Sequence, residues 1–170
     1  LMEQDILQCV YARRSCRKFR QESLQDEDIE VLQKAVECAP SYHNEQPWFF
    51  VFIQNRDILS QMEELCDAKG QSHGAPLVVI GFANLQAHSP VMDTALAFAN
   101  MQYAAMARGL GTCFLQYPVD VCNARQYQEL PSALGVPEGY MCVGALAIGR
   151  KDMENTEDKD IRTDVFSMVY

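Results

Sequence analysis

Apolar and polar residues alternate along the chain with two different periods, and each period predicts a different kind of element. Where apolar residues recur every three or four positions, the pattern predicts helices over residues 3–14, 23–40, 56–67, 90–108 and 120–134. Short continuous apolar runs predict buried strands over residues 48–54, 75–83, 112–116 and 141–149. Helices and strands mixed in this order indicate α/β or α+β layers, in which helices cover a central sheet.

Local signals predict the limits of the first two helices. The first helix carries four apolar residues on one face, which are Ile6, Leu7, Val10 and Tyr11. Ser23 with Asp26 three residues later is a variant of the capping box, so the second helix is expected to begin at Ser23. Pro40 is expected to end that helix, and the polar loop SYHNEQP then leads into the first strand.

The end of the chain reads differently from the rest. A polar connector, RKDMENTEDKD, is followed by IRTDVFSMVY, which ends apolar. An apolar tail behind a solvated connector needs a surface to pack on, because exposed apolar area is unfavourable in water. Either the chain's own domain or a partner subunit could provide that surface, and the pattern leaves both open.

Length and composition favour one compact domain over residues 1–170, since 48% of the residues are hydrophobic. The longest apolar runs are only strand-length, so neither a membrane span nor a signal peptide is expected. The seven cysteines are odd in number and include no CxxC pair. They predict reduced thiols in a cytoplasmic protein, with no disulfide framework and no zinc site.

The net charge of −9 argues against nucleic acid or an anionic membrane as the main partner. Within this acidic chain, five cations crowd into one short stretch: Arg13, Arg14, Arg17, Lys18 and Arg20. Four more lie near the C-terminus: Arg150, Lys151, Lys159 and Arg162. Two interpretations are open, either a local anion site or a solvated helix end at which the helix dipole favours cations.

No set of side chains suggests direct catalysis. His43, His73 and His88 belong to no HExxH motif, and the sequence has neither a P-loop nor a GxGxxG after a strand. Catalytic side chains and metal ligands are therefore not expected. If the protein is an enzyme, a cofactor is expected to carry out the difficult step.

Four stretches, in order between residues 13 and 149, resemble the FMN-dependent nitroreductase family. They are RRSCRKF, APSYHNEQPWFFVFI, DTALAFANMQYAAMARGLGTCF and LPSALGVPEGYMCVGALAIG. The resemblance implies an α+β, three-layer fold with a mixed, mostly antiparallel central sheet flanked by helices. It also implies a homodimer that binds FMN at the subunit interface.

The resemblance implies which residues contact FMN. From the arginine stretch they are Arg13, Arg14, Ser15 and Arg17. From the polar loop, supplied by the other subunit, they are Pro40, Ser41, Tyr42, Asn44 and Gln46. After the alanine-rich helix they are Leu110 and Gly111, and near the C-terminus Arg150 and Arg162, with Lys151 and Lys159 as further candidates. A phosphate with roughly two negative charges suits guanidinium groups, whereas Lys18 and Arg20 are expected to be solvated.

The function implied by the resemblance is that of an FMN-dependent oxidoreductase. NADH or NADPH would reduce the flavin, leave, and be replaced by a small electrophilic acceptor such as a nitroaromatic or a quinone, in a ping-pong mechanism. Two alternatives are a relative with other flavin chemistry, such as reductive dehalogenation, and a non-enzymatic flavin-binding dimer. The polar loop and the glycines at 109 and 111 also have plain structural interpretations, as a connection and as a helix end.

Overall fold

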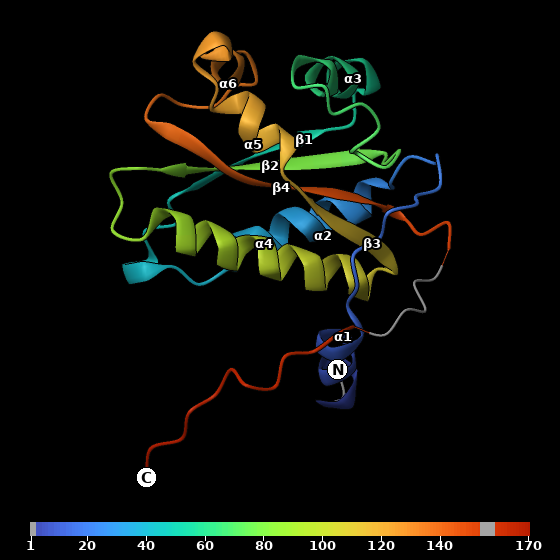
Figure 1. Ribbon diagram of the computed structural model, residues 1–170, viewed down its shortest axis with the longest axis vertical. Coiled ribbons are helices and arrows are strands. Elements are labelled where there is room, and N and C mark those ends of the chain that lie inside the picture. Colours follow the sequence, from blue (N-terminus) through green and yellow to red (C-terminus); the bar gives the residue numbers. More distant parts are fainter. Residues whose placement is uncertain (1–2, 154–158) are drawn as a thin grey trace.

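The computed structural model describes residues 3–153 and 159–170 (Figure 1). Within these residues the α-helices are α1 (Glu3–Ala12), α2 (Asp26–Glu37), α3 (Arg56–Leu65), α4 (Pro90–Ala107), α5 (Tyr117–Cys122) and α6 (Leu130–Ala133). Short 3₁₀ helices are η1 (Tyr42–Asn44) and η2 (Arg125–Tyr127), and the strands are β1 (Trp48–Ile53), β2 (Leu77–Asn84), β3 (Leu110–Leu115) and β4 (Tyr140–Arg150). No helix in the described part of the chain is long and apolar enough to cross a membrane.

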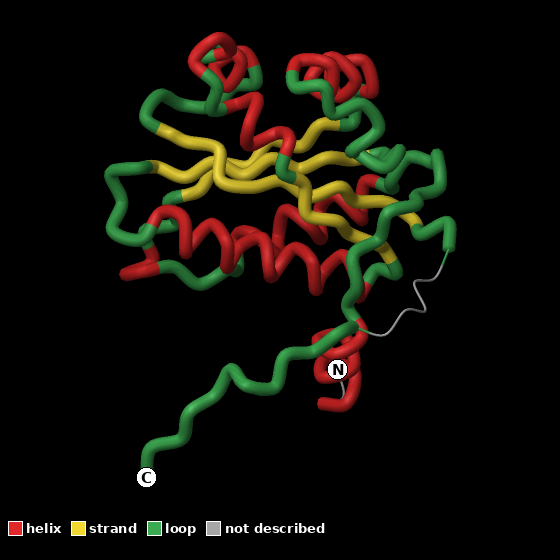
Figure 2. Tube along the Cα trace, viewed as in Figure 1, coloured by secondary structure: helices red, strands yellow, loops and turns green. Residues whose placement is uncertain are grey.

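The strands form one sheet in the order β1-β2-β4-β3, and each neighbouring pair is antiparallel. An isolated parallel bridge between Ser15 and Thr112 adds to the edge of β3. The sheet lies between two layers of helices, with α3, α5 and α6 on one face and α2 and α4 on the other (Figure 2). The expected three-layer α+β fold with a mostly antiparallel sheet is therefore confirmed.

α4 lies close against the sheet because two strands lack side chains where it crosses them. A Cβ atom at Gly81 of β2 would lie 2.5 Å from the Phe98 ring. One at Gly144 of β4 would lie 2.5 Å from Phe114. Phe98 fills this space and packs edge-on against Phe50 and Phe114. The two glycines thus set the depth of α4, and both ends of this helix adjoin residues of the predicted site.

The single helix predicted over residues 120–134 is wrong, since α5, η2 and α6 occupy this region. Asn123 follows α5, and its side chain is tied to β4. Its Nδ2 donates to the Cys142 carbonyl at 2.8 Å, and its Oδ1 accepts from the Cys142 N–H at 3.1 Å. Pro131, which has no backbone donor, then lies in the first turn of α6. A contact with a distant strand therefore interrupts a segment that is locally able to form a helix.

The predicted capping box at Ser23 is also wrong. α2 begins at Asp26, and its N-cap, Gln25, makes no side-chain cap bond. Leu24 is buried in the layer of α2 and α4, so the chain before the helix stays extended to place this side chain. The acidic residues in the first turn of α2 suit the positive end of its dipole, and Asp28 among them is fully buried.

Asp28 joins three parts of the fold through ion pairs. Its carboxylate accepts from Arg108 Nε, at the end of α4, at 2.8 Å. It also accepts from Arg150 Nη2, at the end of β4, at 2.9 Å. Arg150 in turn donates to the Arg108 carbonyl at 2.9 Å. The C-terminal ends of α4 and β4 are therefore held together against the N-terminus of α2.

Replacing Asp28 with alanine is expected to lower the free energy of unfolding by about 2–4 kcal/mol, because two charge-assisted hydrogen bonds are lost. Urea unfolding followed by circular dichroism measures this change. Glu27→Ala, at an exposed position in the same helical turn, is the matched control and should cost less than about 1 kcal/mol. Equal losses in the two variants would show that the Asp28 pairs add nothing beyond the helix dipole.

Candidate functional site

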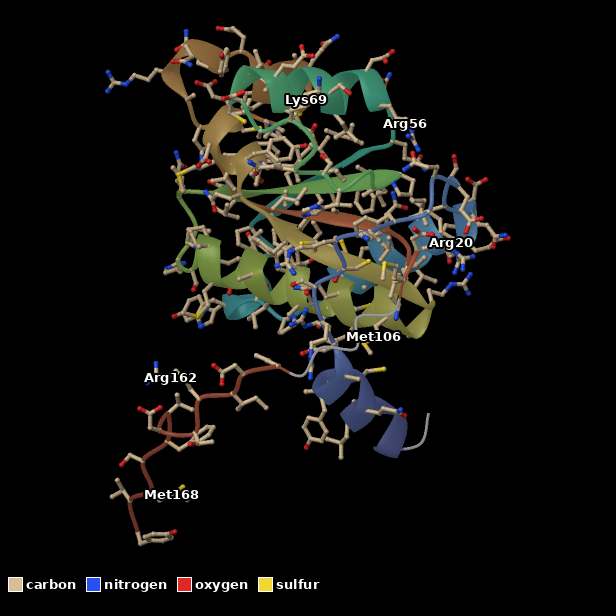
Figure 3. All side chains as sticks on the ribbon, turned by 45° about the vertical axis from the view of Figure 1, so that its right-hand side comes forward. Arg20, Arg56, Lys69, Met106, Arg162 and Met168 are labelled. Atoms are coloured by element: carbon tan, nitrogen blue, oxygen red, sulfur yellow. The ribbon has the colours of Figure 1, made fainter. Side chains whose placement is uncertain are left out.

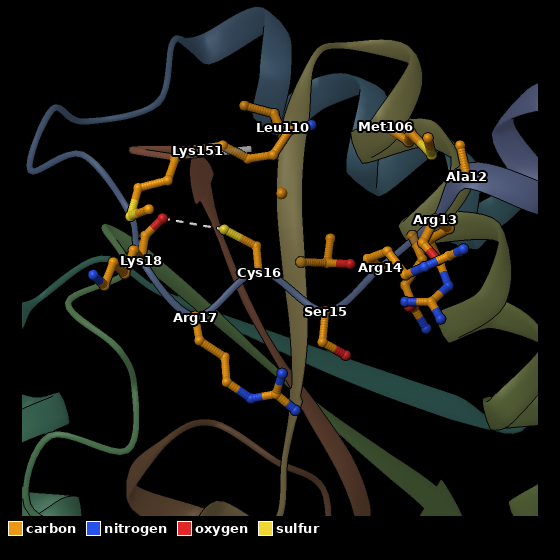
Figure 4. Close-up of a pocket in the computed structure, with 14 residues that line it drawn as sticks. Ala12, Arg13, Arg14, Ser15, Cys16, Arg17, Lys18, Met106, Leu110 and Lys151 are labelled. Carbon is orange, nitrogen blue, oxygen red and sulfur yellow. Dashed lines mark hydrogen bonds between the residues drawn. The ribbon is translucent and has the colours of Figure 1, made fainter. Parts of the chain in front are cut away.

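A pocket of about 370 Å³ lies where the segment after α1 meets the end of α4 and the start of β3 (Figure 4). Its volume falls within the range of small-molecule sites. Residues 12–18 form one wall, and Gln102 and Met106 of α4 form another. The remaining lining residues are Leu110, Gly111 and Thr112 of β3, with Lys151 and Met153 after β4.

Backbone pairing holds the arginine segment against the sheet. Ser15 bridges Thr112, and the Cys16 N–H donates to the Thr112 carbonyl at 2.8 Å. Farther along, Phe19 bridges Lys151. Cys16 and Phe19 are buried in the core, so they anchor the segment, while Ser15 and Arg17 leave its other side (Figure 4). The segment therefore works as an extra edge strand that presents polar side chains to the pocket.

The pocket is strongly cationic. Arg13, Arg14, Arg17, Lys18 and Lys151 all line it, and none of the described lining residues is acidic. Such a wall, within a chain of net charge −9, favours an anionic ligand. Lys18, which was expected to be only solvated, is one of the lining residues.

Arg14 bears on both interpretations of the cation cluster. Its Nη1 donates to the carbonyls of Tyr11, at 2.8 Å, and Arg13, at 2.9 Å, so it caps the C-terminal end of α1. Its Nε, however, is buried and has no hydrogen-bond partner among the described residues. A buried donor without a partner is unfavourable, and a bound anion would supply the missing acceptor.

Gly111 allows three segments to meet at the pocket. A Cβ atom at this position would lie 2.7 Å from Cys16 Cβ and 2.7 Å from Lys151 Cγ. Glycine is therefore required for the arginine segment and Lys151 to approach β3. Two residues earlier, Gly109 takes φ = 70°, the left-handed conformation that ends a helix. Gly109 therefore also fits its plain structural interpretation, as the end of α4.

The predicted residues of the polar loop lie far from this pocket within one chain. The loop contacts the N-terminal end of α4, where the Tyr42 N–H donates to Asp93 Oδ2 at 3.1 Å. Met106, near the other end of α4, lines the pocket. Met106 lies thirteen positions after Asp93 on the same helix, which corresponds to about 20 Å along its axis. Figure 1 shows the two ends of α4 on opposite sides of the molecule.

The two C-terminal arginines lie outside the pocket lining. Arg150 points to Asp28 and the end of α4, as described above. Arg162 belongs to the extended tail and pairs with Asp164 at 3.1 Å. Lys151, next to Arg150, is the cation from this region that lines the pocket.

Sequence reasoning missed several of the lining residues. Cys16 and Thr112 were hidden because each reads as an ordinary core position, and the structure buries both. Gln102 and Met106 lie four residues apart, about one helical turn, in the last part of α4. That spacing was the available signal, since it puts both on one face next to the glycine turn.

Comparison with known proteins agrees with this fold. A model described as Nitroreductase family matches residues 10–86 and 73–150. A curated protein of Archaeoglobus fulgidus with the provisional name NADH dehydrogenase/NAD(P)H nitroreductase is 31% identical over 167 residues, covering 92% of this chain and 93% of its own.

Two solved structures are similar over nearly the whole chain. A nitroreductase with bound FMN from Bacteroides fragilis superposes with a TM-score of 0.87, at 24% identity, over 98% of this chain and 99% of its own. A nitroreductase with bound FMN from Desulfitobacterium hafniense gives 0.86, at 21% identity, over 99% and 100%. At such identities these structures support the fold. The family model and the curated relative go further, and on their evidence this chain belongs to the nitroreductase family.

Proposed function

We propose that the chain is an FMN-dependent NAD(P)H oxidoreductase that passes electrons by a ping-pong mechanism to a small electrophilic acceptor, such as a nitroaromatic or a quinone. The observation that carries this proposal is the cation-lined pocket, in which the buried Nε of Arg14 lacks a hydrogen-bond partner among the described residues. Membership of the nitroreductase family supports the same cofactor.

The residues of the pocket fit FMN. Its phosphate carries roughly two negative charges and accepts several charge-assisted hydrogen bonds. Arg13, Arg17 and Lys151 would hold the phosphate, and the buried Arg14 Nε would gain an acceptor. The Ser15 hydroxyl, on the same side of the segment as Arg17, would face the ribityl chain (Figure 4).

When bound, FMN supplies the hydride chemistry that links NAD(P)H to the acceptor. The chain's own contribution would be to bind and orient the cofactor. None of the described lining residues is His, Asp or Glu, so the ionisable side chains of the pocket are those of Cys16, the two lysines and the arginines. Donor and acceptor would use the same open face of the cofactor in turn, which is the basis of the proposed ping-pong order.

A homodimer would complete the site. The four apolar residues on one face of α1 are exposed, and Val91, Met92, Leu96 and Tyr103 are exposed on α4. Such faces support burial against a second copy. If two copies packed with their α4 helices antiparallel about a two-fold axis, the polar loop of each would approach the partner's pocket. That arrangement would bring together residues about 20 Å apart in one chain.

The C-terminal tail supports the same arrangement. Residues 159–170 run away from the body of the molecule without regular structure (Figure 3). Phe166, Val169 and Tyr170 are all at least 85% exposed. The tail therefore does not pack on its own domain, which leaves a partner subunit as the surface that it would need.

The seven free cysteines agree with the proposed cytoplasmic location.

The proposal is tested by the visible absorption spectrum of the purified protein, before and after NADH or NADPH is added without oxygen. Flavin bands at about 450 nm that bleach are the expected result. Bands that persist with both nucleotides would favour the non-enzymatic flavin-binding protein. Absence of flavin after incubation with FMN would overturn the cofactor itself. A screen of nitroaromatic, quinone and halogenated acceptors with the reduced protein then separates ordinary reduction from dehalogenation.

A further inference from the structure

The polar loop after α2 has an unfavourable backbone conformation. His43, Asn44 and Gln46 have φ values of 47°, 58° and 48°, all in the left-handed region. Non-glycine residues rarely adopt this region, and three of them within four positions require strong external support. The loop must therefore be held from outside its own backbone.

Glu45 provides a clasp that reaches from the loop to the turn before α4. Its Oε2 accepts from the His88 backbone N–H at 3.0 Å, and its Oε1 lies 2.5 Å from His88 Nδ1. The backbone and ring contacts of His88, with a smaller effect of His43, lower the pKa of the Glu45 carboxyl below its usual value. The carboxylate is thus well suited to hold both groups of His88 at neutral pH.

The ring and the backbone N–H of Tyr42 fasten the same loop. The Tyr42 ring stacks on His43 at 4.3 Å and lies 5.2 Å from the His88 ring. The Tyr42 N–H is bound by Asp93 of α4, as described above. His88 therefore touches the loop on two sides, through Glu45 and through Tyr42, and connects it to the beginning of α4.

The clasped conformation also orients Asn44. Gln46 Nε2 donates to Asn44 Oδ1 at 3.0 Å, so the acceptor of this side chain is occupied. The Asn44 amide nitrogen has no hydrogen-bond partner in the described part of the chain, and the residue is exposed. The loop therefore presents a hydrogen-bond donor, which suits a carbonyl oxygen or an unprotonated ring nitrogen.

We propose that Glu45 and His88 are positioning residues that hold the loop of one copy in the shape in which Asn44 donates to the partner's flavin. This proposal rests on the proposed function. It adds a pair of residues that bind no cofactor themselves and act through Asn44. The pair belongs to two segments far apart in sequence, and the clasp exists only in the folded chain.

The test compares Glu45→Ala, His88→Ala, the double variant and Glu45→Gln. We expect Glu45→Ala to raise the dissociation constant for FMN about tenfold, measured by quenching of flavin fluorescence, because the loop relaxes from its strained shape. Hydrogen exchange of the amides at residues 42–46 should become faster. The double variant should lose less affinity than the sum of the two single losses, since both substitutions remove the contact between the Glu45 carboxylate and the His88 ring. Glu45→Gln should recover part of the affinity, because its amide oxygen still accepts from the His88 N–H.

Glu37→Ala, which removes an exposed glutamate paired with Lys34 on α2, is the matched control and should leave both measurements unchanged. If Glu45→Ala speeds exchange but leaves FMN binding unchanged, the loop is clasped without facing the flavin and the positioning role is overturned. Unchanged exchange would overturn the clasp itself. A wild-type protein that binds no FMN would instead refute the proposed function, while the exchange measurement would still report on the clasp.

Discussion

Arg17→Ala is expected to weaken FMN binding by about 10- to 100-fold while the fold survives, and Arg13→Ala should act similarly. Each guanidinium would give one or two charge-assisted hydrogen bonds to the phosphate, and loss of such contacts costs about 1.5–3 kcal/mol. Arg17 is exposed in the pocket wall and forms no hydrogen bond or ion pair with another described residue. Its removal should therefore leave the thermal unfolding curve unchanged.

Titration of the apoprotein with FMN, followed by flavin fluorescence, measures this loss. Arg20→Ala is the matched control, because Arg20 is an exposed arginine of the same segment that does not line the pocket. Its affinity for FMN should match the wild type. If both Arg13→Ala and Arg17→Ala retained stoichiometric FMN, the phosphate could not be assigned to this part of the pocket.

A mixed dimer of Arg17→Ala and Asn44→Ala chains is expected to recover about half of the wild-type flavin sites, although each parent dimer has none intact. In the mixed dimer, one pocket combines the intact Arg17 of one chain with the intact Asn44 of the other. The opposite pocket carries both substitutions. Arg17 and Asn44 of one site are expected to come from different chains, because the length of α4 keeps the arginine segment and the polar loop of one chain about 20 Å apart.

Co-expression with two different affinity tags, followed by two purification steps, isolates the mixed dimer. Bound FMN per dimer is then compared at a concentration at which both parents are mostly empty. Occupancy no higher than the mean of the two parents would show that each site lies within one chain. Failure of the two tags to co-purify would contradict the dimer itself.

The sequence by itself determined the layers of the fold. Runs such as WFFVFI and LVVIGFA are apolar throughout, and they are the strands β1 and β2 of a sheet covered on both faces. The period of the apolar residues also located α3 and α4 to within about two residues. These features are local, because burial of a periodic apolar face needs no particular partner. The arginine segment was found in the same way, from an unusual density of charge in an acidic chain.

Tertiary structure alone decided where continuous patterns are interrupted and which polar groups meet. The contact of Asn123 with β4 divides the helix expected over residues 120–134, and burial of Leu24 delays the start of α2. The cation next to the pocket is Lys151, because its neighbour Arg150 turns to the buried Asp28 on a distant helix. Hydrogen bonds and ion pairs depend on distances of a few ångströms between segments remote in sequence, and no local pattern encodes those distances.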